Sequence, residues 1–298
     1  MIDPGESRSG FVAVLGRPNV GKSTLVNTLV GEKVAIVSDR PQTTRNRIAG
    51  VMNLPGCQAV LLDLPGFQRP LDRMTEKMQA AVNETLGEVD MTLVVLNAVE
   101  PVGPGDRFVA AAAFAAGNPV FVVVNKTDIA TDAQLLAQLE EAAGLGPAEE
   151  FFPVSAATGD GVGELRQAIA SRLPEGPAYF PPDVVSDQPE RVLVGELIRE
   201  QAIRLMREEV PHALAVRVLE MEPREGGGVI DVEAVLVTET KSQKGIVIGH
   251  RGKIIREIGT RARREIEALL GSRVFLDLRV QVRKKWRQDD RMLDELGI

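Results

Sequence analysis

The residues whose types and spacing could bind phosphate lie near the beginning of the sequence. Residues 16–23 fit the pattern G-x-x-x-x-G-K-[ST], between an apolar run at 11–15 and an apolar helix start at 24–29. A glycine loop in that position can turn backbone N–H groups and the positive helix N-terminus towards phosphate oxygens. Lys22 then supplies a cation for the β- and γ-phosphates, and Ser23 a hydroxyl for Mg²⁺. We therefore predict a nucleotide-binding loop made of Gly16, Arg17, Pro18, Asn19, Val20, Gly21, Lys22, Ser23 and Thr24.

Three further polar motifs follow predicted strands, in the order that such a site needs. The first comes directly after an apolar strand: its aspartate can bind Mg²⁺ through water, and the N–H of its glycine can reach a γ-phosphate. It consists of Asp63, Leu64, Pro65 and Gly66. The other two end the predicted strands at 119–124 and 150–154, and they consist of Asn125, Lys126, Thr127 and Asp128 and of Ser155, Ala156 and Ala157.

The second of these motifs predicts which base is bound. An aspartate at position 128 can accept hydrogen bonds from N1–H and the exocyclic amine of guanine, a donor pair that adenine lacks. A site built on polar partners rejects ligands that leave those partners unpaired. We expect Asn125 to join the loops, the Lys126 stem to lie over the base and the Ala156 N–H to meet guanine O6. Loop Asn and Asp more often form caps and turns, but the order of the motifs favours the binding role.

With these motifs in place, residues 9–173 resemble the translation-factor-related GTPases that carry G-x-P-N-V-G-K-S. The resemblance implies that residues 42–45 form the first switch, with Thr44 rather than Thr43 completing the Mg²⁺ shell when GTP is bound. Local turn hydrogen bonds are the other role open to these hydroxyls. The catalytic residues would be Lys22, Thr44, Asp63 and Gly66.

The residue after Gly66 departs from Ras-like enzymes. Phe67 stands where those proteins carry a water-orienting glutamine, and a phenyl ring cannot orient water by hydrogen bonding. We therefore expect slow hydrolysis that depends on Mg²⁺, on backbone groups and on an added cation or partner. GTPases that resemble this one and have Asn in the phosphate loop often use K⁺, so Asn19 is a candidate K⁺ ligand. Gln68 is a weaker candidate for the missing glutamine.

Bulk properties limit the class of protein. Cys57 is the only cysteine, which excludes an intrachain disulfide or a thiolate zinc site and fits a reducing compartment. The N-terminus has no secretory pattern, and no apolar run approaches the roughly 18–20 residues that span a bilayer. We expect a cytoplasmic protein.

The charge is unevenly distributed. The whole chain carries a formal net charge of −7, and residues 1–190 hold 14 Lys and Arg against 24 Asp and Glu. Residues 241–287 hold 14 Lys and Arg against 4 Asp and Glu. Such a basic region in an acidic protein is expected where one part binds a polyanion, although a solvated basic surface would look the same.

The rhythm of apolar runs predicts two domains. Residues 1–173 alternate short strands and helices, which predicts an α/β fold with a doubly wound, mostly parallel sheet, here a P-loop GTPase domain. Residues 174–190 are rich in Pro and Gly and read as a semi-rigid linker. Residues 191–298 predict a smaller α+β domain of helix, two strands, two helices, a strand and a final helix.

Within that second domain, residues 244–255 resemble the KH signature, with Gly249–Gly252 as its G-x-x-G loop. KH loops clamp about four nucleotides of a single strand, and the element order resembles the bacterial, type II variant. After the loop, Lys253, Arg256, Arg263 and Arg264 share one helical face. The opposite face is apolar and is expected to seal a core, with Ile254, Ile255, Ile258, Ala262, Ile266 and Leu269. The predicted RNA-binding residues are Lys244, Gly245, Ile248, Gly249, His250, Arg251, Gly252, Lys253, Arg256, Arg283, Lys284, Lys285 and Trp286. Trp286 could stack on a base or pack in the core.

A GTPase domain followed by a KH domain is similar over nearly the whole chain to the Era family, bacterial GTPases of small-subunit ribosome assembly. The resemblance implies binding of GTP and GDP, and of RNA near the 3′ end of small-subunit ribosomal RNA on the precursor 30S particle. It also implies peripheral contact with the inner membrane. We expect a monomer, in which GTP and Mg²⁺ order residues 31–47 and 63–77 and so control the RNA site.

Two other functions stay open at this point. The protein could be a GTPase that acts on a protein or membrane partner, with the KH-like domain only docking. It could also be an RNA-binding adapter whose nucleotide site is only structural. Charge reversal at Lys253 and Arg256 tests the first, and phosphate release from GTP tests the second.

Overall fold

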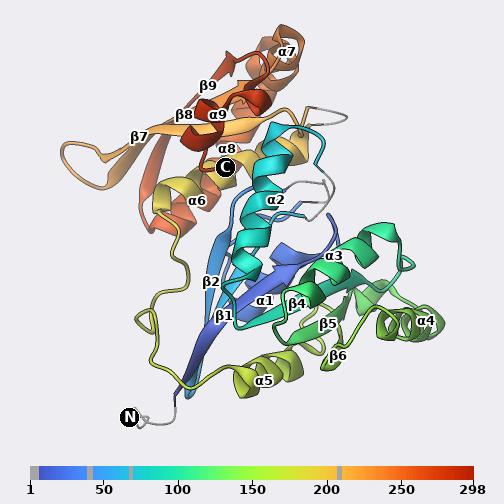
Figure 1. The fold of residues 1–298 in the computed structure, drawn as a ribbon. Coiled ribbons are helices and arrows are strands. Elements are labelled where there is room, and N and C mark those ends of the chain that lie inside the picture. The colour runs from blue at the N-terminus through green and yellow to red at the C-terminus, as the bar shows by residue number, and fades with distance from the viewer. Residues whose placement is uncertain (1–6, 39–42, 67–69, 207–209) are drawn as a thin grey trace. The chain divides into compact units, whose positions relative to one another are not determined.

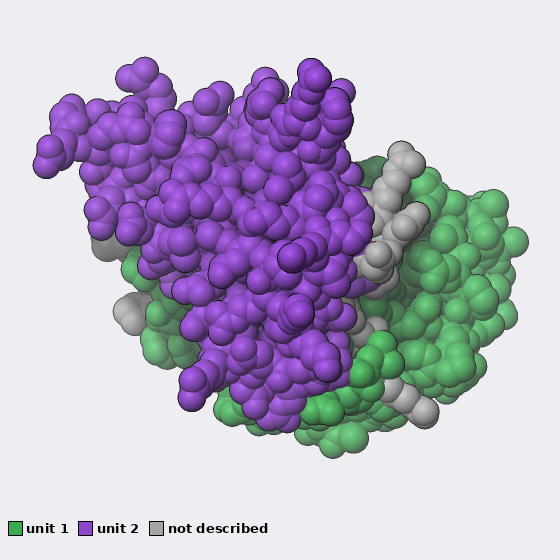
Figure 2. Space-filling view, turned by 90° about the horizontal axis from the view of Figure 1, so that it is seen from above, with its two compact units in different colours: residues 1–37, 42–71, 75–187 green, residues 38–41, 72–74, 188–298 purple. Residues whose placement is uncertain are grey.

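The computed structural model describes residues 7–38, 43–66, 70–206 and 210–298. The chain divides into two compact units, which Figure 2 colours separately. The first contains residues 1–37, 42–71 and 75–187, and the second contains residues 38–41, 72–74 and 188–298. Among the described helices, none combines the length and the apolar character that crossing a bilayer requires.

The first unit is a six-stranded sheet in the order β2-β3-β1-β4-β5-β6, with helices on both faces (Figure 1). Its strands are β1 (Arg8–Leu15), β2 (Ile48–Leu54), β3 (Cys57–Asp63), β4 (Met91–Asn97), β5 (Val120–Asn125) and β6 (Glu150–Val154). Its helices are α1 (Lys22–Val30), α2 (Arg73–Leu86), α3 (Pro104–Ala115), α4 (Asp132–Ala143) and α5 (Val162–Arg172), with a short turn η1 (Thr127–Ile129). Only β2 runs antiparallel to its neighbour, β3.

The apolar strands of this unit are buried because helices cover both faces of the sheet. Leu93 and Val95 of β4 pack with residues of α1 and α5, whereas Val94 and Leu96 pack with residues of α2, α3 and α4. This arrangement places the carboxyl ends of β1, β3, β4, β5 and β6 at one edge, where the polar motifs follow. The predicted doubly wound α/β fold is confirmed.

The second unit is a three-stranded sheet in the order β7-β8-β9, where β7 and β8 are antiparallel and β8 and β9 are parallel. Its elements are α6 (Glu190–Leu205), β7 (Ala215–Pro223), β8 (Val229–Thr238), α7 (Lys241–Ile248), η2 (His250–Gly252), α8 (Lys253–Leu270), β9 (Arg273–Val282), η3 (Trp286–Gln288) and α9 (Asp290–Glu295). Ile198 of α6 and Ile258, Ala262 and Ile266 of α8 share a core with the sheet. The predicted α+β domain of KH type is confirmed.

The Pro- and Gly-rich connector follows the surface of the first unit. Gln58 of β3 is buried and accepts hydrogen bonds from the N–H groups of Tyr179 (2.7 Å) and Phe180 (2.9 Å). The ring of Tyr179 lies 4.8 Å from that of Phe11, and Val51 of β2 donates its N–H to Val185 (2.9 Å). The segment is therefore fastened to the sheet over most of its length, and the predicted domain limits at 173 and 191 stay a prediction.

Candidate functional site

The predicted phosphate loop joins the end of β1 to the start of α1. Gly21 has a φ of 97°, and a Cβ on it would lie 2.3 Å from the side-chain nitrogen of Asn125. A Cβ on Gly16 would lie 2.7 Å from the carbonyl oxygen of Val95. Glycine is therefore required at both positions, because neighbouring atoms leave no space for a Cβ. At Gly21 the left-handed backbone conformation is a second reason.

Lys22 is the first residue of α1, and its ammonium group lies inside the loop. The side chain is 6% exposed, and Nζ donates to the carbonyl oxygens of Gly16 and Arg17, both at 3.0 Å. Burial lowers the pKa of Lys22 to about 8, although the charge of Asp63 acts in the opposite direction. A phosphate group beside this poorly solvated ammonium would favour its charged form.

Two hydroxyl groups and a carboxylate meet beside Lys22. Ser23 Oγ donates to Asp63 Oδ2 at 2.6 Å, Thr44 Oγ1 donates to the same oxygen at 3.0 Å, and the two hydroxyl oxygens are 3.0 Å apart. Burial raises the pKa of Asp63, whereas Lys22 and the two hydroxyl hydrogen bonds lower it. Asp63 is 0% exposed, and its Oδ1 has no hydrogen-bond partner within the described part of the chain.

These three side chains fit a hard divalent cation. They bring only oxygen atoms, which Mg²⁺ prefers, and the unpartnered buried Oδ1 offers a further acceptor. They come from α1, from the segment before β2 and from the end of β3. The hydroxyl of Thr44, the threonine favoured from the sequence, reaches this cluster.

The motif after β3 lies against the phosphate loop. Leu64 and Pro65 are buried, and a Cβ on Gly66 would lie 2.9 Å from Pro18 Cγ and 3.1 Å from Pro18 N. A larger residue at 66 would therefore push the two loops apart. Gln42, Phe67 and Gln68 fall outside the described residues.

Asn125 ties the predicted base-binding loops together. Its Nδ2 donates to Val20 O at 2.9 Å, and its Oδ1 accepts the N–H of Ala156 at 2.9 Å. That N–H, which the sequence assigned to guanine O6, already has an acceptor in this conformation. A bond from this N–H to O6 would therefore share the hydrogen with Asn125 or replace that bond.

The other base-loop residues face the same loop region. Ser155 Oγ donates to Asp128 Oδ1 at 2.7 Å, while Asp128 itself is exposed. Lys126 has a φ of 71°, and its Nζ donates to Asn19 O at 2.7 Å, so that its stem extends back to the phosphate loop. The structure thus brings Asn19, Asn125 and Lys126 together. Ser155 orients the carboxylate that the sequence assigned to guanine.

The predicted G-x-x-G loop joins α7 to α8. Gly249 and Gly252 have φ values of 71° and 73°, and Arg251 has a φ of 51°. A Cβ on Gly249 would lie 2.5 Å from Ile254 Cγ1, so the loop can close onto α8 only with glycine there. His250, Arg251 and Lys253 are exposed around it. The loop therefore requires glycine at position 249, and it exposes the cations Arg251 and Lys253.

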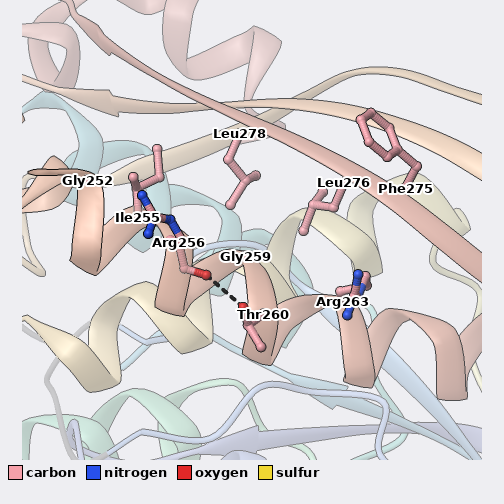
Figure 3. A pocket seen from close by; sticks show the side chains of 9 residues that line it. All are labelled: Gly252, Ile255, Arg256, Gly259, Thr260, Arg263, Phe275, Leu276 and Leu278. Atoms are coloured by element: carbon pink, nitrogen blue, oxygen red, sulfur yellow. Dashed lines mark hydrogen bonds between the residues drawn. The ribbon is translucent and has the colours of Figure 1, made fainter.

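A groove of about 400 Å³ runs from this loop between α8 and β9. Figure 3 shows Leu276 and Leu278 of β9 directed towards α8, with Ile255 and Arg256 on the facing helix. Gly252, Gly259, Thr260, Arg263 and Phe275 complete its lining. Phe275 is 55% exposed, and Gly259 adds no side chain to fill the space. The groove combines an apolar floor with cations at its rim.

The sequence analysis missed the β9 side of this groove. Phe275, Leu276 and Leu278 looked like ordinary residues of an alternating strand, and their place opposite α8 depends on tertiary structure. The one usable signal was a large aromatic residue at position 275, on the face of the strand that the core does not need.

Two expectations for the second domain are corrected. Trp286 is 0% exposed, and its Nε1 donates to Ala213 O at 3.0 Å, so the indole packs inside the protein and cannot stack on a base. Leu269 is 39% exposed and lies outside the core that Ile258 and Ile266 share. The cations beside Trp286 differ in their surroundings. Arg283 lies 3.5 Å from the carboxylate of Asp289, whereas Lys284 and Lys285 are exposed.

Comparisons with known proteins agree with both sites. A family model described as "50S ribosome-binding GTPase" matches residues 11–126, and a KH domain model matches residues 209–287. A GTPase Era of Geobacter metallireducens is 45% identical over 290 residues, which is 97% of both chains. A GTPase Era of Mycobacterium bovis is 47% identical over 297 residues, 98% of this chain and 99% of the other.

Two similar structures contain ligands. A variant of Aquifex aeolicus Era bound to GDP·AlF4⁻ has a TM-score of 0.94 and 37% identity, and the match covers 97% of this chain and 99% of the other. A structure of Era with MgGDPNP and nucleotides 1506–1542 of 16S ribosomal RNA has the same TM-score and identity, with 98% and 99% covered.

Proposed function

The chain belongs to the Era family of GTPases, and we propose that it is a GTP-hydrolysing switch that binds the 3′ end of small-subunit ribosomal RNA through its KH domain. The observation that carries this proposal is the presence of two separate anion sites in one chain. One is the buried Lys22 beside the cluster of Ser23, Thr44 and Asp63, and the other is the cationic groove between α8 and β9.

In the nucleotide site, Ser23, Thr44 and Asp63 would hold Mg²⁺, as the MgGDPNP complex of a relative supports. Bound Mg²⁺ neutralises charge on the phosphate oxygens. Lys22 adds a second positive charge from within the loop, and backbone N–H groups at the start of α1 and at Gly66 contact the phosphates. Catalysis then comes from positioning and charge stabilisation and needs no covalent intermediate.

Base recognition rests on Asp128, whose carboxylate accepts the two guanine donors while Ser155 holds it in place. Lys126 lies along one side of the base. The guanine O6 atom takes an N–H of the 155–157 loop, either that of Ala156, shared with Asn125 or released by it, or that of its neighbour Ala157.

We also propose that K⁺ assists hydrolysis, with Asn19 as a ligand. Asn19 has a φ of 67° and its carbonyl oxygen accepts Lys126 Nζ, so its backbone is held at the side of the phosphate loop. Initial hydrolysis rates in buffers that contain either K⁺ or Na⁺ at equal ionic strength test this role. Faster turnover in K⁺ is expected, and equal turnover would remove it.

In the RNA site, bases of an unpaired strand would lie on the apolar floor formed by Ile255, Leu276 and Leu278. The loop at 249–252 clamps the backbone, and Arg256 and Arg263 at the rim attract its phosphates. Binding to the precursor 30S particle, a cytoplasmic location, contact with the inner membrane and a monomeric state stay predictions.

Crosslinking in cells, followed by sequencing of the RNA attached to the region around Gly249, tests the proposed function. Recovery of the 3′ end of small-subunit ribosomal RNA is expected. A variant with Arg256→Glu and Lys253→Glu should lose that RNA while the protein stays folded. Unchanged RNA recovery with this variant would favour a GTPase whose KH domain only docks on another protein.

A further inference from the structure

One residue of the phosphate loop, Arg17, forms ion pairs with two carboxylates outside the loop. Arg17 extends into the connection between β4 and α3, where its Nε donates to Asp106 Oδ1 at 2.7 Å. Its Nη2 donates to Glu100 Oε2 at 3.1 Å. The guanidinium therefore joins the loop to two carboxylates on a neighbouring connection.

Both carboxylates make a second hydrogen bond within the protein, although only Asp106 is buried and Glu100 is exposed. Asp106 is 2% exposed, and its second oxygen accepts the N–H of Gly103 at 2.9 Å at the start of α3. Glu100 accepts Nδ2 of Asn97 at 2.7 Å, and Asn97 is the buried last residue of β4. The partners of Arg17 thus lie just after a central strand, at Glu100, and in the first turn of α3, at Asp106.

The sequence leaves room for this side chain. A Cβ on Gly105 would lie 2.6 Å from Arg17 Cδ, so any other residue at 105 would displace the arginine. The backbone of Arg17 makes a second contact. Its carbonyl oxygen and that of Gly16 accept hydrogen bonds from Lys22 Nζ. The side chain of Arg17 is therefore anchored on one side of a peptide that holds the phosphate-binding ammonium on the other.

We propose that Arg17 is a positioning residue, whose ion pairs with Asp106 and Glu100 fix the 16–17 part of the loop so that it presents Lys22 to the β-phosphate. The inference rests on the phosphate-binding role of Lys22. In this proposal, ion pairs that lie outside the nucleotide's own contacts contribute to the affinity for the diphosphate. The base-binding residues Asn125 and Lys126 hold the same loop further along, at Val20 and Asn19.

The test compares ligands with and without phosphates. In an Arg17→Met variant of the full chain, GDP should bind about tenfold more weakly and dissociate correspondingly faster, because charge-assisted hydrogen bonds that fix the loop are lost. Guanosine, measured by competition, should bind within about twofold of its original affinity. Arg172→Met is the matched control, since Arg172 pairs with Glu149 on the surface of the same unit, and it should change neither affinity.

Removing Arg17 alone leaves the buried Asp106 without its cation, which can destabilise the fold. The double variant Arg17→Met/Asp106→Asn removes both charges and should show the same selective loss of GDP. The proposal is overturned if either folded variant binds GDP as tightly as the Arg172→Met control, or if guanosine is weakened as much as GDP. Absence of GDP binding by the unmodified chain would instead contradict the proposed function itself.

Discussion

The nucleotide site and the groove proposed for RNA both present cations, but they are built differently. In the first unit the charged groups are buried and hydrogen-bonded within the protein, since Lys22 donates to a backbone carbonyl oxygen and Asp63 accepts from Ser23. In the second unit Arg256 and Arg263 are exposed around an apolar floor. Buried polar partners discriminate sharply, because a wrong ligand leaves them unpaired. An open groove with cations binds many sequences, and its affinity depends on salt.

The largest effect should come from the base-binding loop. Asp128→Asn reverses the donor and acceptor pattern that guanine meets, so GTP affinity should fall by roughly a hundredfold or more while xanthosine triphosphate gains. Calorimetry with both nucleotides measures the change. Asp132→Asn, an exposed acidic residue on α4, is the control and should leave the preference for GTP intact. An Asp128→Asn protein that still prefers GTP as strongly as the parent would refute the assignment.

Two glycine-to-alanine variants test whether the backbone geometry of the loop at 249–252 contributes to RNA affinity, because neither variant changes the charge. Gly249→Ala should weaken binding of an RNA fragment by about tenfold, since its Cβ would lie 2.5 Å from Ile254 Cγ1 and the clamp must open. Gly226 also has a positive φ, of 94°, but a Cβ there meets nothing within 4 Å. Fluorescence anisotropy should therefore find Gly226→Ala unchanged, and equal losses in the two variants would show that the loop clamp is not what binds RNA.

A smaller loss should follow when the groove is filled. Gly259→Leu places a side chain opposite Leu278 and should weaken RNA binding by about fivefold, in the range that one lost base contact gives. Ala268→Leu, at an exposed position of the same helix, is the matched control. Because the change is apolar, the slope of affinity against salt should stay the same. If the two leucine variants bind RNA equally well, bases do not occupy this groove.

The smallest predicted effect concerns the buried ammonium. Lys22 has a pKa of about 8 without nucleotide, and phosphate oxygens beside it raise that pKa. At pH 8 GDP binding should therefore take up about half a proton, and affinity should fall as the pH rises above 8. Calorimetry in buffers of different ionisation enthalpy measures the uptake. Heats that do not depend on the buffer would mean that Lys22 is already fully charged in the free protein.

The two sites also differ in how many of their residues could be predicted from the sequence. The phosphate loop and the residues of α1 are contiguous, so one motif with its flanking strand and helix predicted the site and the sheet around it. Chain order likewise predicted that Asn125 would join the loops, because parallel strands end at one edge.

Contacts set by tertiary packing were harder to predict. The partners of Arg17 lie on a connection whose sequence has no motif, and Gln58 gave no sign that it would fasten the connector. Trp286 was ambiguous because an aromatic beside lysines is equally compatible with a core and with a stacking site, and burial decides between them. The β9 wall of the groove depends on the pairing of β8 with β9.

Control of RNA binding by the bound nucleotide is tested most directly by one measurement. The affinity of the full chain for a fragment from the 3′ end of small-subunit ribosomal RNA is measured by anisotropy with saturating GDP and with a non-hydrolysable GTP analogue, both with Mg²⁺. We predict two different affinities, and by linkage the RNA should change the relative affinity of the two nucleotides by the same factor. Identical RNA affinities in the two states would contradict such control.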